Sequence, residues 1–127
     1  MDKAQLIESA KRLNEPDEAA VEEYSLKRDS ITDRMNRKME QRDDIEHLTG
    51  VGNKQMMLDN HKNHSKFMNS LFTAYNPQVF VETVLWVYRA YRSHGFSADY
   101  WPVQIRNWLE VMSEQLSSET FEAVRPF

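Results

Sequence analysis

Three histidines have spacings that can support ligand binding. His61 and His64 are three residues apart, so on a helix they share one face. Two imidazoles placed in this way can bind a metal ion, but a third ligand must come from elsewhere in the chain. The zinc-protease motif, in which two histidines flank a glutamate, is absent. The alternative is that one or both side chains are hydrogen-bonded in the core or at its edge.

Haem is the more specific ligand to consider. His64 and His94 are 30 residues apart on successive predicted helices, which is similar to the separation of the two haem-facing histidines in globins. Haem needs an axial ligand and an apolar pocket. Against haem, His94 lies next to Gly95 at the end of its predicted helix, where the helix dipole favours a cationic side chain. We therefore predict no metal and no cofactor, with haem bound by His64 and either His61 or His94 as the alternative.

Aromatic and arginine side chains are concentrated around the last predicted interhelical turn. The combination can line a pocket for a small-molecule ligand or form the centre of a protein interface. It also suits a core whose aromatic rings are covered by arginine stems. The residues concerned are Tyr88, Arg89, Tyr91, Arg92, Tyr100, Trp101 and Trp108.

Catalytic motifs are absent from the sequence. The chain has no Cys, which excludes disulfides, thiolate catalysis and cysteine-bound zinc or iron–sulfur sites. Nothing resembles a nucleophile beside its base or a pair of catalytic carboxylates. The short segment Gly50-Val51-Gly52 does not make a phosphate-binding loop. We expect that the protein is not an enzyme.

Composition favours one helical domain. A chain of 127 residues suits a single core, and 40% apolar with 28% charged residues is a globular balance. Three Gly and four Pro leave little material for the turns of an all-β fold. The net charge of −4 argues against a nucleic-acid backbone as partner. The chain starts with polar residues and has no apolar run near the ~20 residues that cross a bilayer, so we expect a cytoplasmic, non-membrane protein.

The histidines and aromatic residues fall on helices predicted over residues 54–116, which we expect to form the core. Over 54–75 one face is apolar apart from its two histidines. Residues 77–94 are apolar on more than one side, which predicts a central helix packed by several neighbours. A helix containing Pro102 follows, and a short terminal helix is predicted over 118–124. The face over 54–75 consists of Met57, His61, His64, Met68, Leu71 and Tyr75.

The N-terminal residues 1–48 are charged and are predicted to form further helices. Asp2 can cap a short helix over 2–13, and Pro16 suits the first turn of the next. Residues 16–48 form one helix or two, because the segment from Ser30 to Asp33 resembles a capping box. Their thin apolar stripe can be covered by the same chain or can pair with a second chain. The stripe consists of Val21, Tyr24, Ile31, Met35 and Met39.

A spaced pattern between His64 and about Leu116 resembles the helical region that precedes cobalamin-binding domains in bacterial regulators. The resemblance implies an all-helical input or coupling module with globin-like packing, of a kind that commonly dimerises. The cobalamin-binding signature Asp-x-His-x-x-Gly does not occur, so cobalamin binding is not implied. The pattern is carried by His64, Phe67, Met68, Leu71, Asn76, Pro77, Phe80, Val84, Trp86, Gly95, Phe96 and Asp99.

Together these observations predict a single all-α domain over residues 1–127, a bundle of five to seven helices. We expect a regulatory or sensory module that acts through protein–protein contact, as a homodimer, without catalysis. A haem or small-cofactor sensor is the alternative.

Overall fold

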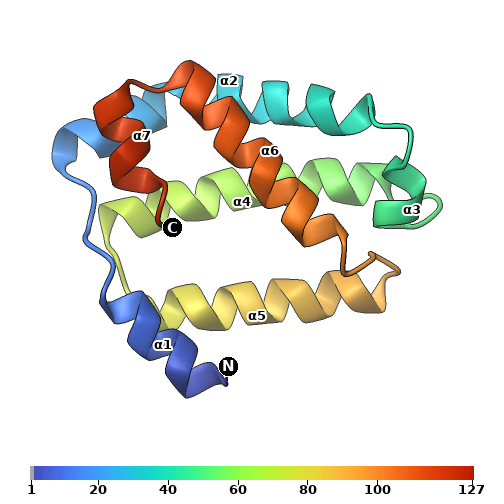
Figure 1. The fold of residues 1–127 in the computed structure, drawn as a ribbon, viewed down its shortest axis with the longest axis horizontal. Coiled ribbons are helices and arrows are strands. Elements are labelled where there is room, and N and C mark those ends of the chain that lie inside the picture. The colour runs from blue at the N-terminus through green and yellow to red at the C-terminus, as the bar shows by residue number, and fades with distance from the viewer. Residues whose placement is uncertain (1) are drawn as a thin grey trace.

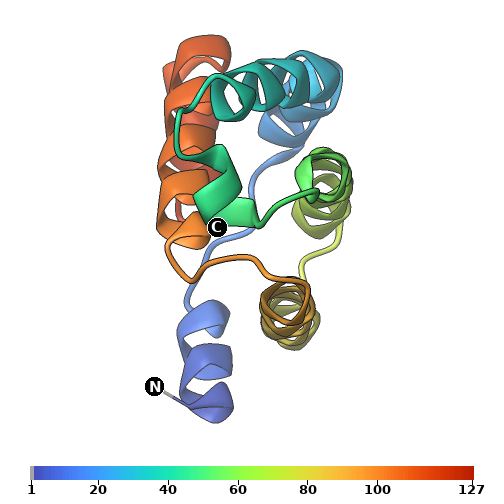
Figure 2. The same cartoon turned by 90° about the vertical axis from the view of Figure 1, so that its right-hand side faces the viewer.

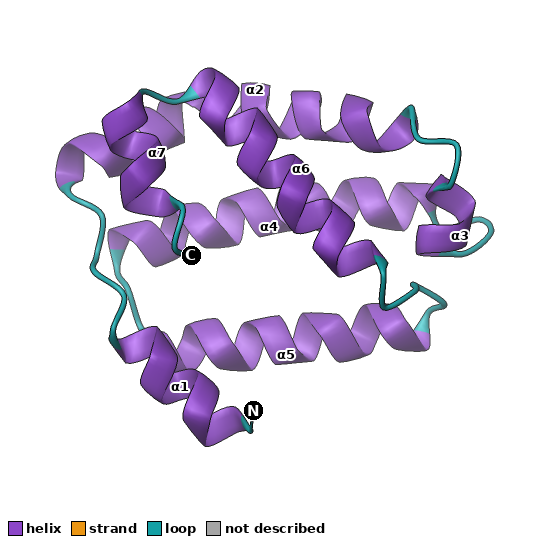
Figure 3. Ribbon diagram, in the orientation of Figure 1, coloured by secondary structure: helices purple, strands orange, loops and turns teal. Residues whose placement is uncertain are grey.

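Helices make up most of the described chain. The computed structural model describes residues 2–127, which form seven helices and no strand (Figures 1 and 3). The predicted all-α bundle of five to seven helices is confirmed. No helix within residues 2–127 has the length and apolar character needed to span a membrane. The helices are α1 (Lys3–Lys11), α2 (Glu18–Glu40), α3 (Ile45–Thr49), α4 (Lys54–Thr73), α5 (Pro77–Ser93), α6 (Tyr100–Gln115) and α7 (Ser118–Val124).

Side-chain caps fix where several helices begin. Asp2 caps α1, as the sequence predicts, and in addition forms a capping box with Gln5. The side chain of Asn76 accepts hydrogen bonds from two backbone amides of α5, directly before Pro77. The prediction for Pro16 is wrong: α2 starts two residues later, because Asp17 is its cap and accepts a hydrogen bond from the third residue on.

Residues 18–40 form one long helix, which answers the question left open by the sequence. The segment from Ser30 to Asp33 does not begin a helix because it lies in the middle of α2, where the Thr32 hydroxyl donates to the Arg28 carbonyl one turn earlier. The short helix α3 follows only after a break. The stripe of α2 is buried by its own chain, so its pairing with a second chain is contradicted. Its buried members are Tyr24, Ile31, Met35 and Met39.

α2 is the central helix of the bundle, and it packs against α4, α6 and α7. The sequence placed the core in residues 54–116, but four of the most buried apolar side chains come from α2. The sequence underestimated α2 because its apolar stripe is thin and its other sides are charged. Nearly all of that stripe is nevertheless buried. The core is therefore shared between the N-terminal third and the rest of the chain.

α5 lies at the edge of the molecule, contrary to the prediction of a central helix. With α1 it forms a separate layer beside the bundle of α2, α4, α6 and α7 (Figures 1 and 2). Of the α5 residues, all of which the structure describes, Val81 alone is buried. Trp86 is 68% exposed. A helix can be apolar on several sides without being packed on all of them. In this structure α1 is the helix that covers α5, and it covers one side.

Aromatic contacts at both ends of α5 attach this layer to the bundle. Near its start, Phe80 lies with its ring centroid 6.2 Å from that of Tyr75 and 6.0 Å from that of Phe127. Near its end, Tyr91 meets Phe96 at 4.9 Å. Beyond α5 the Ser97 amide donates to the Leu48 carbonyl over 2.7 Å, which joins the loop before α6 to α3.

Candidate functional site

His61 lies at the centre of a buried polar network between α2, α4 and α6. Its side chain has no exposed surface. Nδ1 is 2.7 Å from Asn36 Oδ1, and Nε2 is 3.2 Å from the Tyr100 hydroxyl. Because an amide oxygen only accepts, Nδ1 carries the hydrogen and Nε2 is the hydrogen-bond acceptor. Burial lowers the pKa of His61 to about 3, so the ring is neutral at physiological pH.

Tyr100 extends the network toward α6. Its one hydroxyl hydrogen can be donated either to His61 Nε2 or to Asn60 Oδ1, which is 3.1 Å away. Gln104 Nε2 donates to the same Asn60 oxygen over 2.7 Å and to the Tyr100 oxygen over 3.0 Å. Burial raises the pKa of Tyr100 far above its usual range. The network holds three helices together with neutral groups. Each member has at least one hydrogen-bond partner, and a histidine whose pKa is this low is a poor general base at pH 7.

His64 lies one turn beyond His61 and packs on the indole of Trp108. The ring centroids of His64 and Trp108 are 5.2 Å apart, and those of His61 and Trp108 are 5.6 Å apart. Burial lowers the pKa of His64 to about 4, although part of this side chain reaches the surface. Within residues 2–127, the indole nitrogens of Trp101 and Trp108 are buried without a hydrogen-bond partner. Both histidines of the predicted pair thus serve as packing surfaces for Trp108.

His94 is exposed and lies away from the other two histidines. Its carbonyl accepts a hydrogen bond of 2.7 Å from Asn53, directly before α4. His64 follows Asn53 by eleven residues, roughly 16 Å along the helix. Metal binding by His61 would break one of its two hydrogen bonds. Among residues 2–127, no three His, Asp or Glu side chains gather in a way that could hold a metal ion. The geometry therefore gives haem no support, and haem stays a prediction.

The predicted aromatic cluster forms the joint between α5 and α6. Trp101 contacts both Tyr88, at a centroid distance of 5.9 Å, and Tyr91, at 6.1 Å. Arg92 donates to the Phe96 carbonyl over 2.8 Å and so fixes the turn. Arg89 is exposed and lies outside this joint, and Trp108 lies two turns further along α6 with the histidines. The residues that were grouped because they are close in sequence therefore lie in three different places: the joint between α5 and α6, the exposed surface, and the packing around the histidines.

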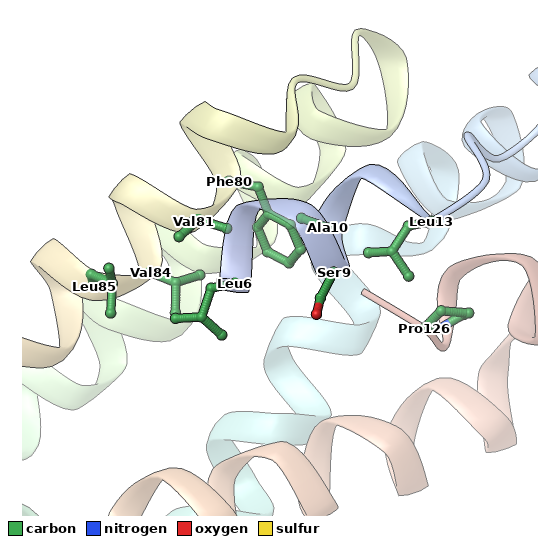
Figure 4. A pocket seen from close by; sticks show the side chains of 9 residues that line it. All are labelled: Leu6, Ser9, Ala10, Leu13, Phe80, Val81, Val84, Leu85 and Pro126. Atoms are coloured by element: carbon green, nitrogen blue, oxygen red, sulfur yellow. The ribbon is translucent and has the colours of Figure 1, made fainter. Parts of the chain in front are cut away.

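An apolar cavity between α1 and α5 has a volume of about 270 Å³ (Figure 4). Ser9 is the one polar side chain among its lining residues. The sequence did not indicate this cavity, although the spacing of Leu6, Ala10 and Leu13 on α1 showed that a face there needed a partner. The lining residues are Leu6, Ser9, Ala10, Leu13, Phe80, Val81, Val84, Leu85 and Pro126.

The exposed apolar side chains of α5 form the largest such group on one helix. Trp86 is 68% exposed, Val84 49%, Val79 46% and Tyr88 41%. Single exposed apolar residues are ordinary on a protein surface, whereas a group of several on one helix is unusual. In sequence these residues suggested a buried helix, and only the layer arrangement shows that they are uncovered.

Comparison with known proteins identified no relative of this chain. A scan against family models found no match, and searches of curated proteins and of solved structures found none either. The resemblance to regulators with cobalamin-binding domains and the globin-like packing therefore stay predictions.

Proposed function

We propose that this chain is a regulatory or sensory helical module of the cytoplasm that acts through protein–protein contact, and that α5 is the contact surface. The observation that carries the proposal is the exposure of Trp86 on the outer layer. Tryptophan is enriched among the interface residues that contribute most to binding free energy. An exposed tryptophan on a helix is therefore a candidate for such a contact. A homodimer is the form of contact that we propose.

The neutral polar network supports this proposal rather than a catalytic one. His61, Tyr100 and Gln104 are linked by hydrogen bonds and hold the bundle rigid, which leaves α5 as the element free to bind. A rigid support with one exposed apolar helix is the arrangement that helix-in-groove or helix-on-helix recognition uses. The pattern resemblance over residues 64–116 supports a role as an input or coupling module.

The test is site-specific photo-crosslinking in cells that express the protein. A photo-reactive amino acid replaces Val79 on α5 in one variant and Leu26 on α2 in the control. Leu26 is 79% exposed and lies on another helix. We expect one discrete protein adduct from position 79 and none from position 26.

Adding Trp86→Asp to the position-79 variant should remove that adduct. The free monomer should keep its melting temperature, because Trp86 contributes little to the core. Equal adducts from positions 79 and 26, or an adduct that survives Trp86→Asp, would contradict α5 as the contact surface.

A further inference from the structure

One stripe of α5 is exposed along its whole length. Val79, Glu82, Trp86, Arg89 and Ser93 recur at spacings of three and four residues, and all five are exposed. This spacing places them on one face of the helix and is the spacing of paired helices. The cavity under α1 uses four other α5 residues, so the stripe is a separate face. We call it the outer stripe.

We propose that the outer stripe pairs antiparallel with the outer stripe of a second copy of this chain, an inference that rests on the proposed function of α5 as a contact surface. Trp86 is seven residues after Val79 and seven before Ser93. A two-fold axis beside Trp86 therefore places Val79 opposite Ser93 of the second copy. The same axis brings the two Trp86 rings together, as an isologous contact requires.

The charges of the outer stripe select the antiparallel direction. Glu82 lies about one turn before Trp86, and Arg89 lies about one turn after it. Antiparallel pairing brings Glu82 of each copy within reach of Arg89 of the other, which forms two attractive pairs. Parallel pairing in register would instead place Glu82 beside Glu82 and Arg89 beside Arg89, which is unfavourable.

Glu82 already has two partners in the monomer, and Gln78 Nε2 donates to its Oε1 over 3.2 Å. Lys3 on α1 lies 3.0 Å from its carboxylate, and both side chains are about half exposed. A carboxylate has two oxygens and can accept from Lys3 and from an arginine at once. The Lys3 pair therefore does not block the contact, and it holds the Glu82 side chain on the outer stripe.

The size of the contact sets its strength. A single pair of 17-residue helices that meet along one stripe buries less than the ~1,200 Å² at which specific stable interfaces begin. We therefore expect a dimer that dissociates on dilution, and its fraction depends on protein concentration.

Disulfide crosslinking tests the direction directly, because the chain has no Cys of its own. Val79→Cys and Ser93→Cys chains are prepared separately, mixed in equal amounts at a concentration where light scattering detects dimer, and oxidised. We expect a covalent dimer in the mixture and little in either variant alone. In the antiparallel pair the two copies of residue 79 are about 21 Å apart along the helix, too far for a disulfide. Leu26→Cys, on the exposed part of α2, is the control and should give no covalent dimer.

Exchanging the charges at positions 82 and 89 tests how much these pairs contribute to dimerisation. These variants carry no introduced cysteine. Glu82→Arg alone and Arg89→Glu alone should each weaken dimerisation about tenfold, because each creates two like-charge pairs. The double variant restores opposite charges and should return to within about threefold of the original dissociation constant, measured by analytical ultracentrifugation.

Three results would overturn the antiparallel dimer. Crosslinking of Val79→Cys with itself would show a parallel pair, and a dimer without any α5 crosslink would place the interface elsewhere. A strict monomer at millimolar concentration would remove the second copy as partner. In that last case a photo-adduct from position 79 to a different protein would still leave the proposed function of α5 standing.

Discussion

At the scale of single residues, the buried network around His61 is the most specific feature of the molecule. Each of its members is polar, yet each lies where an apolar side chain would be ordinary. Such networks are stable only when every donor and acceptor is satisfied, and one missing group leaves the others without partners in a low-dielectric environment.

Removal of the Tyr100 hydroxyl should therefore destabilise the folded protein. We expect Tyr100→Phe to lower the free energy of unfolding by about 1–3 kcal/mol, because Nε2 of His61 and one contact of Gln104 lose their partner. Urea denaturation at pH 7 measures the change. Tyr88→Phe is the matched control, since Tyr88 is 41% exposed, and its effect should stay within about 0.5 kcal/mol. Equal effects of the two substitutions would show that the network contributes nothing beyond packing.

The buried histidines also predict how stability depends on pH. Burial lowers the folded-state pKa of His61 to about 3 and of His64 to about 4, from an ordinary value of 6.5. Below pH 6.5 the unfolded chain therefore binds protons that the folded chain does not, so stability is fully present above pH 6.5 and falls as the pH drops toward 4. The slope is at most about 1.4 kcal/mol per pH unit for each histidine.

The contribution of His61 should exceed that of His64, which reaches the surface. Chemical denaturation at pH 7, 6 and 5 measures the slope, and His64→Gln should reduce it. His94→Gln, at an exposed position, is the matched control. A flat stability profile between pH 7 and 5 would mean that neither ring is held neutral.

Sequence reasoning reached His61 but not its partners. The spacing of α4 placed His61 on an inward face and gave a hydrogen-bonded core residue as one of two interpretations. The partners Asn36 and Tyr100 lie 25 and 39 residues away, on other helices, so no local pattern links them. A buried polar network is defined by tertiary geometry, and periodicity shows only which side chains point inward.

At the scale of elements, the end of the chain is held to α2 by one carboxylate. Glu23 accepts from the Ser117 amide over 2.6 Å, from the Ser117 hydroxyl over 2.7 Å and from the Thr120 hydroxyl over 3.0 Å. These contacts, the Ser117 amide first, lower the pKa of Glu23 to about 2. The start of α7 thus has a negative charge from α2 in addition to its own Glu119.

Neutralising this carboxylate should loosen α7. We expect Glu23→Gln to speed amide hydrogen exchange in residues 118–124 by several-fold while α4 is unchanged, because an amide group replaces the charge at the helix start. The same loosening should develop in the original protein as the pH falls from about 4.5 toward 2, since stability from a lowered carboxyl pKa is lost on protonation. Glu22→Gln, one residue away and exposed, is the control. Unchanged exchange in α7 would show that packing alone holds it.

The boundaries of three helices were predictable to within two residues from local sequence signals, whereas those of α2 were not. The prediction for 118–124 agrees with α7, and those for 54–75 and 77–94 differ from α4 and α5 by one or two residues. The roles of the helices were not predictable. α5 has the more apolar sequence and lies outside, whereas charged α2 is central, because burial depends on which faces meet and not on total apolarity.

At the scale of the whole molecule, two layers of unequal stability are expected. The layer of α1 and α5 is attached by a few aromatic contacts, whereas α2, α4 and α6 share the core and the polar network. We expect amides of α1 and α5 to exchange through local opening, with smaller protection than those of α2 and α4.

Tyr91→Ala should accelerate exchange in the second half of α5 and leave α2 unchanged, because it removes contacts with Phe96 and Trp101. Mass spectrometry of peptides from each helix measures both effects. Ala90→Gly, one residue earlier on the same helix, controls for helix propensity alone. Uniform protection across all helices would show that the layers open together.

The central position of α2 has a consequence for synthesis of the protein on the ribosome. Its contacts with Gln115, Ser117 and Thr120 involve residues that are translated more than 80 positions later. At roughly 5–20 residues per second, α2 emerges on the order of 5–20 s before those partners exist. Until then α4 is the one long helix available to shield Met35 and Met39. The nascent chain therefore exposes the apolar stripe of α2 while translation continues, and this interval is when ribosome-associated chaperones have the most to bind.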